Sequence, residues 1–103
     1  MSKKLNIDPI NSWIKSDSDP LIISGPCSAE SYDQLRDTCT QLKSHGINLM
    51  RAGVWKPRTR PGTFEGNGED ALKWIADIKK ELDVQFTVEV ANTSHIELAL
   101  QYG

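Results

Sequence analysis

Three short strand-like runs, each rich in apolar residues, alternate with segments of helical periodicity, and this order restricts the possible folds more than any other feature of the chain. The runs occupy residues 20–25, 47–52 and 84–90. The first is the unbroken apolar pattern of a strand buried on both faces. Far more than the two residues of a hairpin turn separate successive runs, so the sequence predicts parallel strands joined by right-handed helical crossovers. The chain is therefore expected to be an α/β protein.

Capping residues locate the expected helices. Ser31 and Gln34 form a plausible capping box that opens the first helix, and Gly46 suits the left-handed position that closes it. One face of this helix carries Leu35, Cys39 and Leu42. Asn67 is expected to cap the second helix and Asp83 to end it, with an apolar stripe of Leu72, Ile75, Ile78 and Leu82.

A third helix is expected near the end of the sequence. Ser94 and Glu97 have the spacing of a second capping box, and the helix is predicted to continue to Gly103. The predicted order is therefore strand–helix, repeated three times. The open doubly wound sheet and the (β/α)8 barrel both use this order.

Length favours an incomplete barrel. A whole barrel needs about 250 residues, and the chain has 103. Three parallel strands would also leave both sheet edges open. We therefore expect the first three βα units of a TIM (β/α)8 barrel, truncated from a longer protein. Residues 1–19 are expected to form an N-terminal arm and residues 20–103 the partial barrel domain.

Composition excludes several classes of protein. The chain is 38% hydrophobic and 25% charged, as in an ordinary globular domain, and no apolar run has the ~20 residues of a membrane span. The amino terminus lacks the apolar core of a signal peptide, which favours the cytoplasm, where both cysteines would remain reduced. A net charge of −2 argues against general nucleic-acid binding.

Residues 49–61 concentrate positive charge in this acidic chain. Arg51, Lys56, Arg58 and Arg60 lie within ten residues of one another. Pro57, Pro61 and Gly62 prevent a regular helix or a central strand, so the cations should lie on a stiff loop after the second strand. Guanidinium and ammonium groups form short, charge-assisted bonds to phosphate oxygens. The loop is therefore predicted to bind a small anion, most plausibly a phosphate.

Other reactive side chains follow the remaining strands. Cys27 comes two residues after the first strand, Arg51 ends the second, and Glu89 lies at the end of the third. In a parallel barrel or a doubly wound sheet, the carboxyl ends of the strands form the working face. Each residue also has an ordinary explanation. Cys27 could be a small buried residue, the cations could be solvated, and Glu89 could either transfer a proton or form a salt bridge to Arg51 or Lys56.

The motifs resemble those of a known enzyme family. Gly25-Pro26-Cys27-Ser28, then Arg51, then Lys56-Pro57-Arg58-Thr59 are similar to the motifs of type I 3-deoxy-D-arabino-heptulosonate 7-phosphate (DAHP) synthases, in their short branch. The resemblance covers roughly residues 20–103. It implies condensation of phosphoenolpyruvate with erythrose 4-phosphate, with release of phosphate, at the start of the shikimate pathway to aromatic amino acids.

The resemblance also implies roles for individual residues. Cys27 would be one ligand of a divalent metal ion (Mn, Fe, Zn or Co) that polarises the aldehyde, while the other family ligands come from later strands. Arg51 and Lys56 would bind phosphoenolpyruvate, whereas Arg58 and Thr59 would contact the aldose phosphate. Pro57 would fix the backbone between the two groups, and Lys56 and Glu89 are the catalytic candidates. Arg60 departs from the family's usual small residue and is expected to face solvent, and His45 and His95 are read as solvated or capping residues.

Two rival functions remain open. The related 3-deoxy-D-manno-octulosonate 8-phosphate synthase uses arabinose 5-phosphate, but its loop usually reads Lys-Ala-Asn-Arg-Thr-Ser, so the Lys-Pro-Arg-Thr of this chain favours the heptulosonate enzyme. A non-catalytic phosphate-binding module is the alternative if the protein has only these 103 residues. The isolated chain is expected to be inactive. Its expected partners are phosphorylated small molecules, without nucleic acid or membrane, and the complete enzyme is expected to be a homo-oligomer.

Overall fold

Three parallel strands form the sheet of this protein. The computed structural model describes residues 6–14, 20–55 and 66–103. Strands β1 (Ile23–Ser24), β2 (Leu49–Arg51) and β3 (Gln85–Thr87) lie side by side in chain order. All neighbouring pairs are parallel, and Leu49 of β2 pairs with Ile23 on one side and Gln85 on the other. The predicted α/β order is confirmed, with strands shorter than the apolar runs.

Helix α1 (Tyr32–Ser44) begins and ends as the sequence predicts. The Ser31 hydroxyl accepts a hydrogen bond from the backbone N–H of Gln34 at 3.0 Å. The Gln34 side chain accepts from the N–H of Glu30, so the reciprocal bond of the box is shifted by one residue. Gly46 follows the helix with a φ of +84°, the left-handed conformation that glycine adopts without steric cost.

Helix α2 (Glu69–Leu82) begins differently from the prediction. Its N-cap is Gly68, with φ +57° and ψ −126°, and no side chain caps it. Asn67 was the expected cap, and that prediction is wrong, because its amide instead donates to the backbone carbonyl of Ala29 at 2.7 Å. A tertiary hydrogen bond therefore uses the side chain that a local rule assigns to the helix. Asp83 ends α2 in a left-handed conformation, as predicted.

Helix α3 (Thr93–Gln101) corrects two further predictions. Its N-cap is Asn92, whose side-chain oxygen accepts from the N–H of His95 at 2.9 Å. The helix thus begins before Ser94, so the expected capping box of Ser94 and Glu97 does not form. The helix also stops short of Gly103, because Tyr102 is its C-cap.

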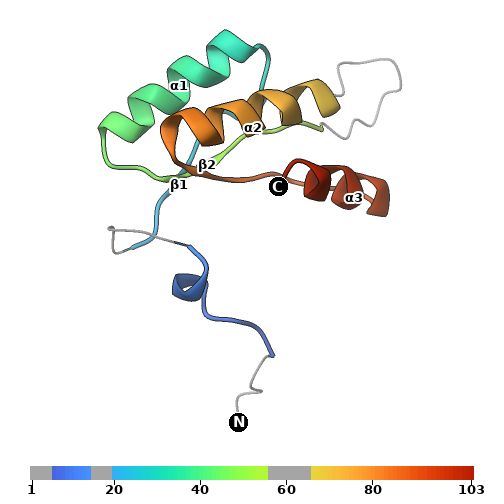
Figure 1. Ribbon diagram of the computed structural model, residues 1–103, viewed down its shortest axis with the longest axis horizontal. Helices are drawn as coiled ribbons and strands as arrows, with labels where there is room; N and C mark the ends of the chain where they lie inside the picture. The colour runs from blue at the N-terminus through green and yellow to red at the C-terminus, as the bar shows by residue number, and fades with distance from the viewer. Residues whose placement is uncertain (1–5, 15–19, 56–65) are drawn as a thin grey trace.

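The hydrophobic core lies between the sheet and helices α1 and α2, which run side by side over one face of it (Figure 1). The predicted stripes of both helices contribute to this core, and Met50 and Val54 fill it from the sheet side. Across the outer surface of the helix pair, Arg36 forms an ion pair with Glu81. The Lys43 ammonium also donates to the Leu82 carbonyl. This layer covers one face of the sheet.

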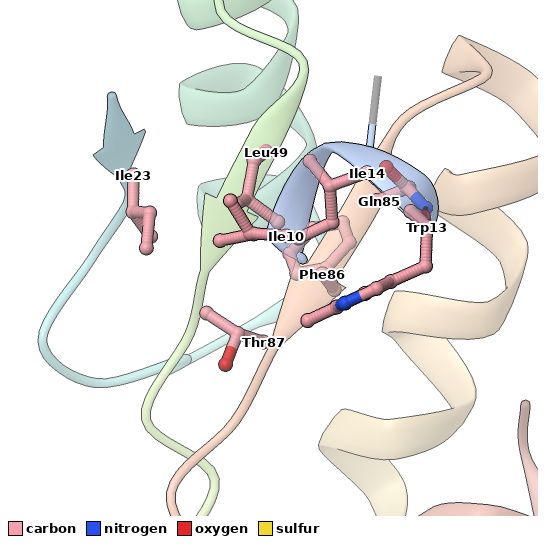
Figure 2. A pocket seen from close by; sticks show the side chains of 8 residues that line it. All are labelled: Ile10, Trp13, Ile14, Ile23, Leu49, Gln85, Phe86 and Thr87. Carbon is pink, nitrogen blue, oxygen red and sulfur yellow. Dashed lines mark hydrogen bonds between the residues drawn. The ribbon is translucent and has the colours of Figure 1, made fainter. Parts of the chain in front are cut away.

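The opposite face of the sheet is covered only in part. A 3₁₀ segment, η1 (Ile10–Ser12), lies across this face, and a cavity of about 180 Å³ remains between them. Figure 2 shows the residues that line it, with Ile10 and Ile14 directed toward Leu49. Ile22 and Ile23 are 46% and 48% exposed, so the expectation that the first strand is buried on both faces is wrong for the described residues. In the described part of the chain, no helix is long and apolar enough to cross a membrane.

Candidate functional site

Arg51 lies at the carboxyl end of the central strand. It is the last residue of β2, it is half-buried, and its register partner in β3 is Thr87. On the other side, the chain leaving β1 passes so close that a Cβ atom at Gly25 would lie 1.9 Å from the Arg51 carbonyl oxygen. The backbone that carries the guanidinium is therefore held from both neighbouring strands.

Cys27 lies on the loop between β1 and α1, at the same edge of the sheet, and it is exposed. This loop is tied to the chain that follows β2, because the N–H of Ala29 donates to the carbonyl of Gly53 at 2.9 Å. From the α1 side, the Gln34 amide donates to the Ser28 carbonyl at 3.1 Å. The Ser28 hydroxyl is buried and has no hydrogen-bond partner among the described residues. Cys27 is thus carried by a braced loop rather than by an extended surface segment.

The described residues that flank segment 56–65 lie close together. The N–H of Gly68 donates to the Val54 carbonyl at 2.8 Å. A Cβ at Gly66 would lie 2.2 Å from that same oxygen, so a larger residue would force the two chains apart. Asn67 joins this junction to the β1–α1 loop through its bonds to the carbonyls of Ala29 and Glu30. The β1–α1 loop and the described residues on either side of segment 56–65 are therefore joined by hydrogen bonds.

Glu89 lies two residues beyond the end of β3 and is exposed. With Trp55, Val90 and Ala91 it lines a shallow hollow of about 50 Å³. Within the described residues, Glu89 forms no ion pair, so the structural salt bridge to Arg51 is not seen. Glu89 thus lies beside Trp55, the last described residue before segment 56–65.

Trp55 and His95 form a contact that the sequence patterns do not predict. Their rings stack with centroids 4.0 Å apart and planes 5° apart. The N–H of Ala91 also donates to Nδ1 of His95 at 3.1 Å, so this histidine does cap the start of α3 as expected. Nothing in the local pattern could reveal the stack, because forty residues separate the two rings. The only available signal was the aromatic residue beside the basic loop.

The remaining predicted site residues are Lys56, Pro57, Arg58 and Thr59, and with Arg60 they lie outside the described residues. No group of three histidine, cysteine, aspartate or glutamate side chains within the described ranges could hold a metal ion. Cys27 alone therefore does not make a metal centre, and the described residues do not fit a complete one. The structure brings Cys27, Arg51 and Glu89 to one edge of the sheet, on three different loops or strand ends.

Parallel β-α units that carry polar side chains at the carboxyl ends of their strands occur in enzymes with a (β/α)8 barrel or a doubly wound sheet. Comparison with known proteins specifies the family. The DAHP synthetase I family matches residues 4–102, and the chain belongs to this family. The resemblance predicted for roughly residues 20–103 is therefore confirmed, and the match begins earlier, at residue 4.

Individual relatives agree with this assignment. The chain is 31% identical over 82 residues to the phospho-2-dehydro-3-deoxyheptonate aldolase of Thermotoga maritima, covering 80% of this chain and 24% of that protein. A crystal structure of a Thermotoga maritima phospho-2-dehydro-3-deoxyheptonate aldolase (DAHP synthase) superimposes with a TM-score of 0.71 at 27% identity. The superposition covers 79% of this chain and 23% of that one. The chain thus spans about a quarter of the length of these relatives, and its fold corresponds to part of their barrel.

Proposed function

We propose that these residues contribute the β1–β3 edge of a DAHP synthase active site, which condenses phosphoenolpyruvate with erythrose 4-phosphate and releases phosphate. Residues 20–103 would be the barrel portion and residues 1–19 an arm. The observation that carries this proposal is the position of Arg51. It ends the central strand at the edge where Cys27 and Glu89 also lie, and its backbone is fixed by both neighbouring strands.

Arg51 has the chemistry for a doubly anionic substrate. Its guanidinium presents planar N–H donors that can bind a carboxylate or a phosphate through two hydrogen bonds. A half-buried arginine gives stronger electrostatic interactions than one in bulk water. We assign Arg51 and Lys56 to phosphoenolpyruvate, where their charge would also stabilise the transition state as its carbon attacks the aldehyde.

The remaining assignments extend the site around Arg51. Arg58 and Thr59 would bind the phosphate of the aldose, and Pro57 would separate the two anion sites. Glu89 faces a hollow beside Trp55 and is assigned to positioning a water molecule or transferring a proton. In the full native protein that carries these residues, Lys56→Ala should greatly reduce turnover without unfolding the protein.

Cys27 is the described residue suited to a metal ion. A thiolate is a good ligand for Zn, Fe or Co, and the family resemblance implies a divalent metal here. One thiolate cannot define a coordination geometry, so we derive no step that depends on the metal. Cys27→Ala should abolish any stimulation of activity by added metal, and metal-independent activity in both proteins would remove Cys27 from this role.

A substrate competition tests the choice between the two synthases. The full native protein is supplied with phosphoenolpyruvate and equal concentrations of erythrose 4-phosphate and arabinose 5-phosphate. The proposal predicts preferential consumption of erythrose 4-phosphate. Faster consumption of arabinose 5-phosphate would identify the octulosonate enzyme. Phosphoenolpyruvate binding without any turnover would identify the non-catalytic anion-binding module.

Two further properties stay predictions. A cytoplasmic location would be checked by fractionating cells of the source organism. Homo-oligomerisation would be checked by light scattering on the full native protein, where a monomer would contradict it.

A further inference from the structure

The chain is attached on both sides of Glu89, the residue assigned above to a water molecule or a proton. Val88 directly precedes it and packs against the hydrophobic core. Ala91 follows two residues later, and its backbone N–H donates to Nδ1 of His95 at 3.1 Å. The short segment that connects β3 to α3 therefore has one attachment before Glu89 and one after it.

The bond from Ala91 also determines which nitrogen of His95 carries the ring proton. A backbone N–H can only donate, so Nδ1 accepts and the proton of the neutral imidazole lies on Nε2. His95 is the third residue of α3, a position from which a side chain can reach back to the chain before the helix. Gln34 is the third residue of α1 and does the same, because it accepts from the N–H of Glu30. The two helix starts therefore share one geometry, with different acceptors.

The imidazole ring is held from a second side. It stacks on the indole of Trp55, with ring centroids 4.0 Å apart and planes 5° apart. Stacked aromatic rings attract each other beyond the simple burial of their area. The backbone N–H of His95 also donates to the side chain of Asn92, the N-cap of α3, at 2.9 Å. These contacts keep the ring in the orientation that the bond from Ala91 requires.

Helix α3 is a firm support for His95, because it is attached to α2 independently of the ring. The Tyr102 hydroxyl donates to Glu69 at the start of α2 at 2.7 Å, and this bond raises the pKa of Tyr102. The Lys79 ammonium donates to the carbonyl of Gly103 at 2.8 Å. The position of His95 therefore does not depend on the aromatic stack alone.

We propose that His95 is a positioning residue for Glu89, acting through the hydrogen bond that its Nδ1 accepts from Ala91. The inference rests on the function proposed above, because it concerns the carboxylate assigned there. A proton-transfer group works only within hydrogen-bond reach of its target, so a shift of the chain at Ala91 would move the carboxylate out of reach. His95 is assigned no contact with substrate. The stack orients the ring, and the acceptor nitrogen performs the role.

Three substitutions in the full native protein separate the acceptor from the ring. His95→Ala removes both, and His95→Phe keeps an aromatic face without an acceptor. His95→Gln removes the ring but keeps an acceptor like that of Gln34 at the start of α1. His45→Ala is the matched control, because His45 is an exposed histidine at the end of α1 that bonds to the Gln41 carbonyl.

Steady-state kinetics provide the first readout. His95→Ala and His95→Phe should lower kcat about tenfold, a part of the roughly hundredfold or more that a positioned acid–base group contributes. The KM for phosphoenolpyruvate should stay within about twofold of the wild-type value, because Arg51 is unchanged. His95→Gln and His45→Ala should keep the kcat of the wild type. Restoration of kcat by His95→Phe, or a loss with His95→Gln equal to that with His95→Ala, would overturn the role of the Nδ1 bond.

A double substitution tests whether His95 acts through Glu89. Glu89→Gln alone should lower kcat by about a hundredfold or more. If His95 only positions this carboxylate, His95→Ala should cause no further loss in the Glu89→Gln protein, because the two residues then act as one unit. A further loss of about tenfold in that protein would show that the two effects are independent and would overturn the proposal.

Amide hydrogen exchange does not require turnover. The N–H of Ala91 should exchange about tenfold faster in His95→Ala and His95→Phe than in the wild type and His95→Gln, because it has lost its acceptor. The N–H of Gly68, which donates to the Val54 carbonyl, is the reference for general opening. Unchanged exchange at Ala91, or equal acceleration at Gly68, would overturn the positioning role. A wild-type protein without turnover would overturn the proposed function, whereas faster exchange at Ala91 would still support the hold of His95 on this segment.

Discussion

Gly25 and Arg51 approach each other so closely that only a hydrogen atom fits between them. A Cβ at Gly25 would lie 1.9 Å from the carbonyl oxygen of Arg51 and 2.9 Å from the backbone nitrogen of the same residue. The glycine therefore allows the chain leaving β1 to cross the end of β2, which places the loop of Cys27 beside Arg51. The position of the Cys27 loop beside Arg51 therefore depends on the absence of a side chain at Gly25.

Gly25→Ala should consequently destabilise the protein by about 2–3 kcal/mol, the cost of forcing an extra carbon into close-packed structure. Gly46→Ala is the control, because no atom lies within 4 Å of its Cβ position and only its φ of +84° is unfavourable. That variant should lose about 1 kcal/mol. Urea denaturation of both variants provides the measurement, and equal losses would show that the contact with Arg51 is not tight.

Asn67→Ala should weaken the attachment of the β1–α1 loop to the start of α2. The substitution removes the amide that donates to Ala29 at 2.7 Å and to Glu30 at 3.3 Å. Loss of these bonds should cost about 1–2 kcal/mol. Thr40→Ala is a control that removes an exposed hydroxyl bonded within α1. An Asn67→Ala variant as stable as Thr40→Ala would contradict the bridging role.

The two cysteines should differ sharply in reactivity. Cys27 is exposed, whereas Cys39 is fully buried and its burial raises the pKa of the thiol to about 11. Only the thiolate reacts readily with iodoacetamide, so at about pH 8 the native protein should gain one adduct, on Cys27. Mass spectrometry before and after unfolding checks this, and early labelling of Cys39 would contradict the packing of α1.

Cys39 should also make stability fall in alkaline solution. Its pKa rises from 9.0 to about 11 on folding, so the folded state holds the proton more tightly than the unfolded state. The resulting stabilisation is fully present below pH 9 and is lost as the pH rises toward 11. Cys39→Ala should show a shallower decline in denaturation experiments over this range. An unchanged slope would mean that other groups cause the decline.

Local patterns predicted the elements well and their contacts poorly. The stripe of α2 and the cap at Ser31 follow from residues within one or two turns, so the sequence displays them directly. Asn67 and Ser94 both satisfy the capping rule, yet neither caps its helix. In one case Ala29 competes for the side chain, and in the other Asn92 provides an earlier cap. Such competition is settled only when distant segments come together.

In the candidate site, too, the sequence predicts where residues lie along the strands but not which distant residues contact one another. The strand ends placed Cys27, Arg51 and Glu89 on one edge because parallel strands share a direction. The stack of Trp55 on His95 and the close approach of Gly25 involve residues far apart in the chain, and no periodicity encodes them. The exposure of Ile23 was missed because an apolar run shows which residues prefer burial, but not how much structure covers them.

Arg51 is proposed to bind phosphoenolpyruvate at this edge of the sheet, and the steady-state kinetics of Arg51→Ala in the full native protein measure the contribution of this side chain. Arg36→Ala is the control, because Arg36 carries an exposed ion pair to Glu81 on the helix surface. The kcat/KM for phosphoenolpyruvate should fall about a hundredfold in Arg51→Ala and stay at the wild-type value in Arg36→Ala. Equal kcat/KM values for Arg51→Ala and the wild type would contradict this proposal.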